Sequence, residues 1–145
     1  CNSLHVFIED IRKAVSIPVL SIVEETAIYV KQKGFSIVGL ISTSATVANN
    51  VYESKFKEND IKFVTPNDLQ RAKMDKIIQR LIEGQHLNSD RELILEVVNE
   101  LSGQNVECVA LACTDLQLLL PSGGAVPIFD TMKLLAEATV REILA

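Results

Sequence analysis

Residues Val106-Glu107-Cys108-Val109-Ala110-Leu111-Ala112-Cys113-Thr114-Asp115 decide the fold class of this chain. The run from Val106 to Ala112 is almost entirely apolar, and it ends at a thiol followed by two polar residues. An apolar run closed by polar residues and followed by a helical pattern is typical of a parallel strand buried in an α/β sheet. Ligands of such sheets bind beyond the carboxyl ends of the strands, so Cys113 is a candidate site residue.

The sequence around this strand alternates between strand and helix patterns. Apolar runs rich in β-branched residues predict strands at 35–41, 60–64 and 126–129. Helical spacing and capping residues predict helices at 4–15, 24–33, 47–57, 67–82, from Ser89 or Asp90 to Gly103, and 131–144. This alternation indicates an α/β fold with a parallel sheet flanked by helices. Three residues at strand ends should share one edge of that sheet: Thr43, Cys113 and Asp130.

Composition excludes several classes of function. The chain has 145 residues, of which 48% are hydrophobic and 23% charged, as in one ordinary globular domain. Its net charge of −5 and lack of a basic cluster disfavour nucleic-acid binding. The apolar runs are too short to cross a membrane, which takes about 20 residues. Three cysteines do not make a disulfide framework, so we expect a reducing, cytoplasmic setting.

Two of the three cysteines, Cys1 and Cys113, stand just before a predicted helix start, and the helix after Cys113 is predicted over the run Leu116 to Leu120. Cys1 is followed by Asn2 and Ser3, either of which can cap the helix at 4–15. A helix dipole favours the thiolate form of a cysteine at its N-terminus. His5 lies one turn after Cys1 and can steady that charge further.

Two thiols facing each other across a pocket can invert a carbon centre without a cofactor. One thiolate removes a proton from one face of the carbon, and the opposite thiol delivers a proton to the other face. Small hydrogen-bonding side chains must then bind a carboxylate and stabilise the carbanion as it forms. The chain offers such side chains near both thiols and near the end of strand 35–41: Asn2, Ser3, Thr43, Thr46 and Thr114.

The same residues also have structural interpretations. Cys108, in mid-strand beside Glu107, is predicted to be a small core residue, and Cys113 has the same alternative. The polar side chains of residues 43–46 and 130–131 can serve as ordinary helix caps. His5 has the alternative of a partly exposed helix residue.

The spacing does not support a metal or a bound cofactor. Cys108 and Cys113 are five positions apart, so on a strand they point to opposite faces and cannot hold one ion together. A glycine-rich phosphate loop should follow a strand, whereas Ser122-Gly123-Gly124 precedes one. We therefore expect chemistry without metal or cofactor.

These residues resemble the motifs of the aspartate/glutamate racemase family, the cofactor-independent amino-acid racemases. Cys1-Asn2-Ser3-Leu4-His5 is similar to the family's Cys-Asn-Thr-x-His, and Ala112-Cys113-Thr114-Asp115-Leu116 to its Gly-Cys-Thr-Glu-Leu. Residues 39–46 are similar to Gly-Leu-x-Gly-Thr-x-x-Thr, and residues 127–131 to Pro-x-x-Asp-Thr. The departures at Ser3, Ser42, Ala112 and Asp115 each keep the size or charge type.

The resemblance implies a two-lobed α/β fold with the active site in the cleft. Cys1 and Cys113 would be the paired acid and base of a thiol/thiolate mechanism. The resemblance further implies substrate contacts from Asn2, Ser3, Thr43 and Thr114, to which we add Thr46. His5 and Asp115 would support the two cysteines. Members of the family commonly form dimers, so we expect a homodimer.

The family's N-terminal lobe, with its glycine-rich opening and a basic residue that reads the substrate side chain, has no counterpart in this sequence. We therefore assign residues 1–22 to a remnant of the first lobe and residues 23–145 to the second α/β lobe. We expect this stretch alone to lack full activity.

The expected function is racemisation of an acidic amino acid, aspartate or glutamate, with aspartate preferred. Related two-cysteine enzymes of the same fold, the hydantoin racemases and maleate isomerases, are the alternative. A different class of answer is a non-catalytic α/β module whose thiols are only structural.

Overall fold

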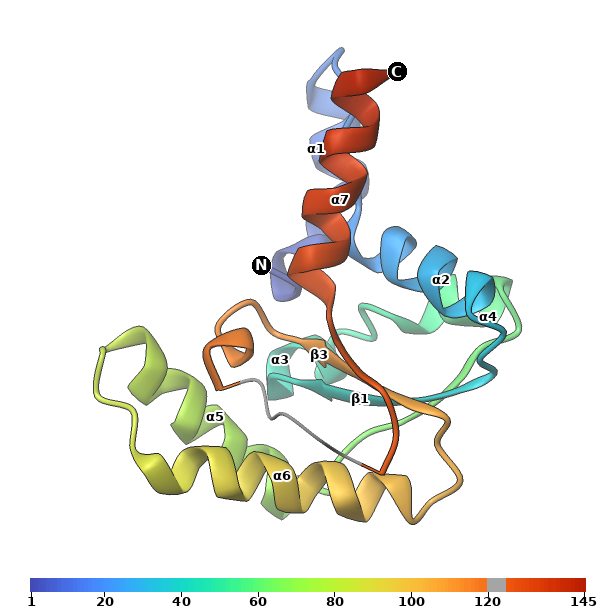
Figure 1. Ribbon diagram of the computed structural model, residues 1–145. Helices are drawn as coiled ribbons and strands as arrows, with labels where there is room; N and C mark the ends of the chain where they lie inside the picture. Colours follow the sequence, from blue (N-terminus) through green and yellow to red (C-terminus); the bar gives the residue numbers. More distant parts are fainter. Residues whose placement is uncertain (120–124) are drawn as a thin grey trace.

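The sheet is parallel throughout and has helices on both faces (Figure 1). A computed structural model describes residues 1–119 and 125–145, so Ser122-Gly123-Gly124 lies outside the described residues. The four strands, in the spatial order β2-β1-β3-β4, are β1 (Ile37–Ser42), β2 (Lys62–Val64), β3 (Cys108–Ala112) and β4 (Ile128–Asp130). The predicted fold class is confirmed.

The helices form a layer on each side of the sheet, because side chains of β1 and β3 alternate between two cores. Val38, Leu40 and Ala110 face α2 (Ile22–Gln32), α4 (Glu53–Glu58) and α7 (Thr131–Leu144). Ile41 and Leu111 face α5 (Asp68–Ile82) and α6 (Asn88–Ser102). Figure 1 shows these two helices on the side of the sheet opposite α2.

Strand register brings three carboxyl ends to one edge. Ser42 at the end of β1 pairs with Ala112 at the end of β3, and Leu111 pairs with Asp130 at the end of β4. The residues that follow these ends therefore lie on one edge of the sheet, as the sequence predicts for Thr43 and Cys113.

Local sequence signals fix most helix ends. Ser21 accepts a hydrogen bond from the Glu24 N–H at the start of α2, and Gly34 ends that helix with φ +76°. The Asn67 side chain begins α5 in a capping box. Asp130 caps α7 by accepting from the Met132 N–H, as predicted.

The predicted helix at 47–57 is wrong, because the chain forms two short helices there. α3 (Ser44–Ala48) begins earlier than predicted, since the Thr43 hydroxyl accepts from the Thr46 N–H and caps it. Asn50 then adopts φ +51°, a left-handed conformation that asparagine tolerates and a helix does not. The break separates α3 from α4.

The predicted helix at 4–15 also divides in two. It begins as a 3-10 helix, η1 (Ser3–Phe7), and continues as α1 (Ile8–Ala14). Its apolar side chains are not packed into either core: Leu4 is 59% and Phe7 54% exposed.

Of the helix predicted after Cys113, the described residues form a 3-10 helix, η2 (Leu116–Leu119), in place of an α-helix, and residue 120 lies outside the described residues. Within residues 1–119 and 125–145, every helix is too short or too polar to span a membrane.

Candidate active site

Three hydroxyls join the start of the chain to the end of β1. Ser3 Oγ lies 3.0 Å from Thr43 Oγ1 and 2.9 Å from Thr46 Oγ1, and the two threonine hydroxyls lie 3.0 Å apart. Ser3 and Thr43 are half-buried, whereas Thr46 is 1% exposed. This cluster places the first cysteine motif at the edge of the sheet where the strands end.

Asn2 ties the same segment to β3. Its side-chain oxygen accepts a hydrogen bond from the Tyr52 hydroxyl, and its Nδ2 donates to Thr131 Oγ1 at 3.4 Å. Thr131 in turn donates to the carbonyl oxygen of Leu111 at 2.9 Å, two residues before Cys113. The two cysteine motifs therefore meet at one edge of the sheet.

The predicted helix-capping role of Asn2 is wrong, because its side chain makes no capping bond and is 2% exposed. Its amide oxygen and nitrogen are both engaged inside the protein. In this arrangement the amide is not presented to a ligand, and it holds the cysteine segment in place.

His5 uses both ring nitrogens on backbone atoms. Nδ1 lies 3.1 Å from the Cys1 carbonyl oxygen, and Nε2 accepts from the Ile22 N–H at 3.0 Å. Since a nitrogen that accepts a hydrogen bond carries no proton, the ring is neutral with its proton on Nδ1. Burial lowers the pKa of His5, which favours the same neutral form. His5 therefore links Cys1 to the start of α2 and supplies no positive charge to a thiolate.

Cys113 lies at the end of β3 and is only 7% exposed. Burial raises the pKa of its thiol, and the backbone N–H groups of Asp115 and Leu116 oppose this shift to a smaller extent. The thiol lies 3.9 Å from Asp115 Oδ2, to which it can donate. The backbone N–H groups that follow Cys113 do favour the thiolate, as the sequence predicts, but desolvation outweighs them and the net pKa of the thiol is raised.

The remaining predicted site residues fall around these two motifs. Cys1 is exposed and Thr114 is half-buried. Cys108 is fully buried among the side chains of α2 and α4, on the face opposite Cys113, and burial raises its pKa to about 12. It is the predicted core residue, and the expected division of the two thiols between opposite faces is confirmed.

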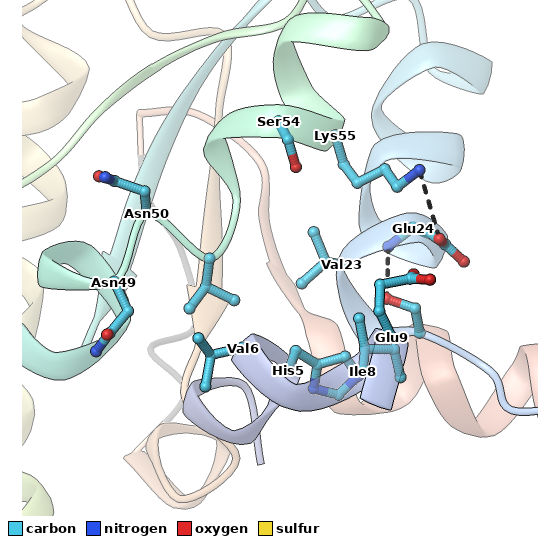
Figure 2. A pocket seen from close by; sticks show the side chains of 12 residues that line it. His5, Val6, Ile8, Glu9, Val23, Glu24, Asn49, Asn50, Ser54 and Lys55 are labelled. Carbon is cyan, nitrogen blue, oxygen red and sulfur yellow. Dashed lines mark hydrogen bonds and ion pairs between the residues drawn. The ribbon is translucent and has the colours of Figure 1, made fainter. Parts of the chain in front are cut away.

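A cavity of about 240 Å³ lies beside the first motif, between η1, α2 and the α3–α4 connection (Figure 2). Neither Cys1 nor Cys113 is among the described residues that line it. Its acidic groups are paired: Glu24 lies 2.7 Å from Arg12 and 3.6 Å from Lys55, and Glu9 lies 3.2 Å from Arg12. The Arg12–Glu24 pair joins α1 to α2, the Lys55–Glu24 pair joins α4 to α2, and the Glu9–Arg12 pair lies within α1.

Sequence reasoning missed two residues that shape this site. Tyr52 supplies the buried hydroxyl that binds Asn2, and Asp75 on α5 accepts from the Ser44 N–H at 3.0 Å, beside Thr43. The Asn49-Asn50 pair could have indicated the position of Tyr52, because asparagine favours turns. A break in the helix at this pair moves Tyr52 out of helical register. The sequence of α5 gives no comparable signal for Asp75.

Comparison with known proteins extends these observations. A family model described as Asp/Glu/Hydantoin racemase matches residues 1–139. The broad specificity amino-acid racemase RacX of Bacillus subtilis is 30% identical over 146 aligned positions, which cover 100% of this chain and 63% of that protein.

Two solved structures are similar in fold. A candidate Asp/Glu racemase from Yersinia pestis has a TM-score of 0.91 and 30% identity, over 100% of this chain and 64% of the other. An aspartate racemase from Picrophilus torridus has a TM-score of 0.77 and 27% identity, over 98% of this chain and 59% of the other. The chain thus spans slightly less than two thirds of the length of these proteins. With a family model that matches nearly its whole length and two cysteine motifs gathered at one sheet edge, the chain belongs to the Asp/Glu/hydantoin racemase family.

Proposed function

We propose that this chain carries the two-cysteine site of an amino-acid racemase that acts on an acidic amino acid, with aspartate as the preferred substrate. The hydrogen bonds that bring Cys1-Asn2-Ser3 to the end of β3, where Cys113 lies, are the observation that carries this proposal. Similarity to the Picrophilus aspartate racemase supports aspartate in particular.

In the proposed mechanism Cys113 begins one direction of the reaction as the thiol, because burial raises its pKa. Cys1, as thiolate, takes the α-proton from one face of the substrate, and the electron pair of the C–H bond stays on the carbon. Cys113 then gives its proton to the opposite face. The reaction leaves Cys1 as thiol and Cys113 as thiolate, which is the starting state for the reverse direction.

The hydroxyls near the thiols have the chemistry to bind the substrate. Ser3 and Thr43 are half-buried and can donate to an α-carboxylate, while Thr46 holds both of them in place. Thr114, next to Cys113, can donate to the same substrate from the other motif. Charge that develops on the carboxylate as the carbanion forms is stabilised by such fixed donors. No cofactor enters these steps.

The proposal includes a division of the chain. The helices η1 and α1 contain no fully buried residue and follow directly on the first cysteine, whereas residues 23–145 contain the whole described sheet. We assign the first segment to one lobe of a two-lobed racemase and the rest to the other. The active form we propose is a cytoplasmic homodimer, in keeping with three free cysteines.

Deuterium incorporation tests the mechanism. We expect incubation of the intact protein, with both lobes, with one enantiomer of aspartate in deuterated water to place deuterium at the α-carbon. Cys1→Ala and Cys113→Ala should each lower the rate by about a thousandfold, since each removes one reacting thiol. Cys108→Ala is the matched control and should stay within about twofold of wild type, because that thiol lies in the opposite core.

A hydantoin racemase or maleate isomerase is the second candidate, which the hydantoin racemases in the family description favour. A 5-substituted hydantoin and maleate, each assayed in the same way, separate these substrates from aspartate. If the intact protein exchanges no α-proton of any of the three substrates, the chain is a non-catalytic module.

A further inference from the structure

A buried chain of hydrogen bonds runs from Tyr52 to β3 through the first cysteine motif. Tyr52 binds Asn2, Asn2 binds Thr131, and Thr131 binds the carbonyl oxygen of Leu111. All three side chains are at least 98% buried. Asn2 adjoins Cys1, and Leu111 lies two positions before Cys113. This series of hydrogen bonds therefore connects the two segments that carry the proposed reacting thiols.

For each hydrogen bond of this network, only one assignment of donor and acceptor is possible. The Leu111 carbonyl oxygen can only accept, so Thr131 must donate to it and must accept from Asn2. Asn2 therefore turns its NH₂ group toward Thr131 and its oxygen toward Tyr52, which must donate. Because every donor and acceptor in the network has a single partner assignment, the network favours one arrangement of these side chains.

Tyr52 reaches Asn2 because of the break between α3 and α4. Asn50, two residues earlier, has φ +51°, and the Val51 N–H donates to the Thr46 carbonyl oxygen at 3.2 Å. The Tyr52 ring packs edge-on against Phe56, with 5.1 Å between ring centroids, which fixes the direction of its hydroxyl. Tyr52 is therefore held by its own core contacts independently of Asn2.

We propose that Tyr52 is a positioning residue for Cys1: through Asn2 it fixes the first cysteine motif against β3, and so sets Cys1 in register with Cys113. This inference rests on the proposed two-cysteine site. It assigns Asn2 and Thr131 to the same positioning network and places Tyr52 outside direct contact with substrate.

Tyr52→Phe removes only the hydroxyl, and Tyr29→Phe is the matched control, since Tyr29 is the other tyrosine in the chain and lies half-buried on α2. We expect Tyr52→Phe to lower kcat of racemisation by about tenfold or more with KM nearly unchanged, because misplacement of a reacting group affects the chemical step. Thr131→Val should behave alike, and Thr131→Ser, which keeps the hydroxyl, should restore kcat.

Hydrogen exchange provides a readout that does not require activity. The His5 N–H donates to the Asn2 carbonyl oxygen at 3.1 Å, so its exchange reports how firmly Asn2 is held. We expect Tyr52→Phe to speed exchange of the His5 amide by about tenfold, while β1 amides keep wild-type rates. Tyr29→Phe should change neither.

The two measurements separate failure of the inference from failure of the proposed function. If wild type is inactive but Tyr52→Phe frees the His5 amide, the racemase proposal fails and the positioning role stands. A Tyr52→Phe protein with wild-type kcat and wild-type exchange at His5 overturns the positioning role. A uniform loss of protection across β1 and η1 also overturns it, because Tyr52 is then only a core residue.

Discussion

At the scale of single residues, His5 has a different role from the one that its motif predicts, because it binds backbone atoms and does not stabilise a thiolate. Its two backbone bonds require the neutral ring. The folded-state pKa of His5 lies below its ordinary value near 6.5, mainly because of burial. As pH falls, the unfolded state therefore takes up a proton at His5 before the folded state does. The contribution of His5 to the free energy of unfolding is present above about pH 6.5 and is lost as pH falls below it.

We predict that the His5 ring carries its proton on Nδ1 and titrates below pH 6.5, as ¹⁵N NMR of the ring nitrogens can show. His5→Gln should flatten the loss of unfolding free energy between about pH 7 and pH 5, because it removes the titrating group. His86→Gln, in the exposed α5–α6 connection, controls for loss of an imidazole. An imidazolium at His5 at neutral pH would contradict the geometry.

Sequence reasoning at this scale found the residues but not their partners. It singled out Asn2, His5 and Thr131 as polar residues near the thiols or helix starts, and all three lie near the site. It could not assign the contact of Asn2 with Tyr52, because those residues are 50 positions apart and meet only in the fold. A pKa set by burial, as at Cys113, likewise depends on packing that no local pattern encodes.

At the scale of elements, the strands were predictable because apolar runs bounded by polar residues have few alternatives in a parallel sheet. Only the edges of each run differ, by one or two residues. The helix at 47–57 was not predictable in the same way. Its apolar spacing is real, but the earlier cap at Thr43 and the left-handed Asn50 divide it.

Close approach of α6 to β1 gives a prediction at this scale. A Cβ at Gly39 would lie 3.1 Å from Val109 Cγ2 and 3.3 Å from Leu101 Cδ1, both fully or almost fully buried. We expect Gly39→Ala to lower the free energy of unfolding by about 1–3 kcal/mol, through overpacking. Gly103→Ala, where the nearest atom lies 3.4 Å away, should change it by about 0.5 kcal/mol or less in the same urea titration.

At the scale of the whole molecule, several exposed apolar side chains lie on η1, α1 and α7. In Figure 1, α1 and the end of α7 extend to the same side of the sheet. Phe7 on η1 is 54% and Ile143 on α7 is 75% exposed. Surfaces of this kind mark sites of association, and a second copy of the chain is the partner we propose.

We predict that the purified chain self-associates through this surface, as sedimentation velocity can measure. Phe7→Glu and Ile143→Glu should each weaken association by about tenfold, since each buries a charge in an apolar contact. Leu69→Glu is the matched control: Leu69 is 68% exposed on α5, in the layer on the other face of the sheet. Equal effects of all three substitutions would argue against an interface on this surface.

The burial of Cys108 and the exposure of Cys1 make the two thiols separate probes of unfolding and of the folded state. Cys108 is buried between the sheet and the layer of α2 and α4, and burial raises the pKa of its thiol to about 12, so an alkylating agent in solution reaches it only when this layer opens. Its labelling rate therefore measures opening of this core, whereas labelling at Cys1 proceeds in the folded protein. One alkylating reagent can therefore measure the rate of opening at Cys108 and the accessibility of Cys1 in the folded protein in a single experiment.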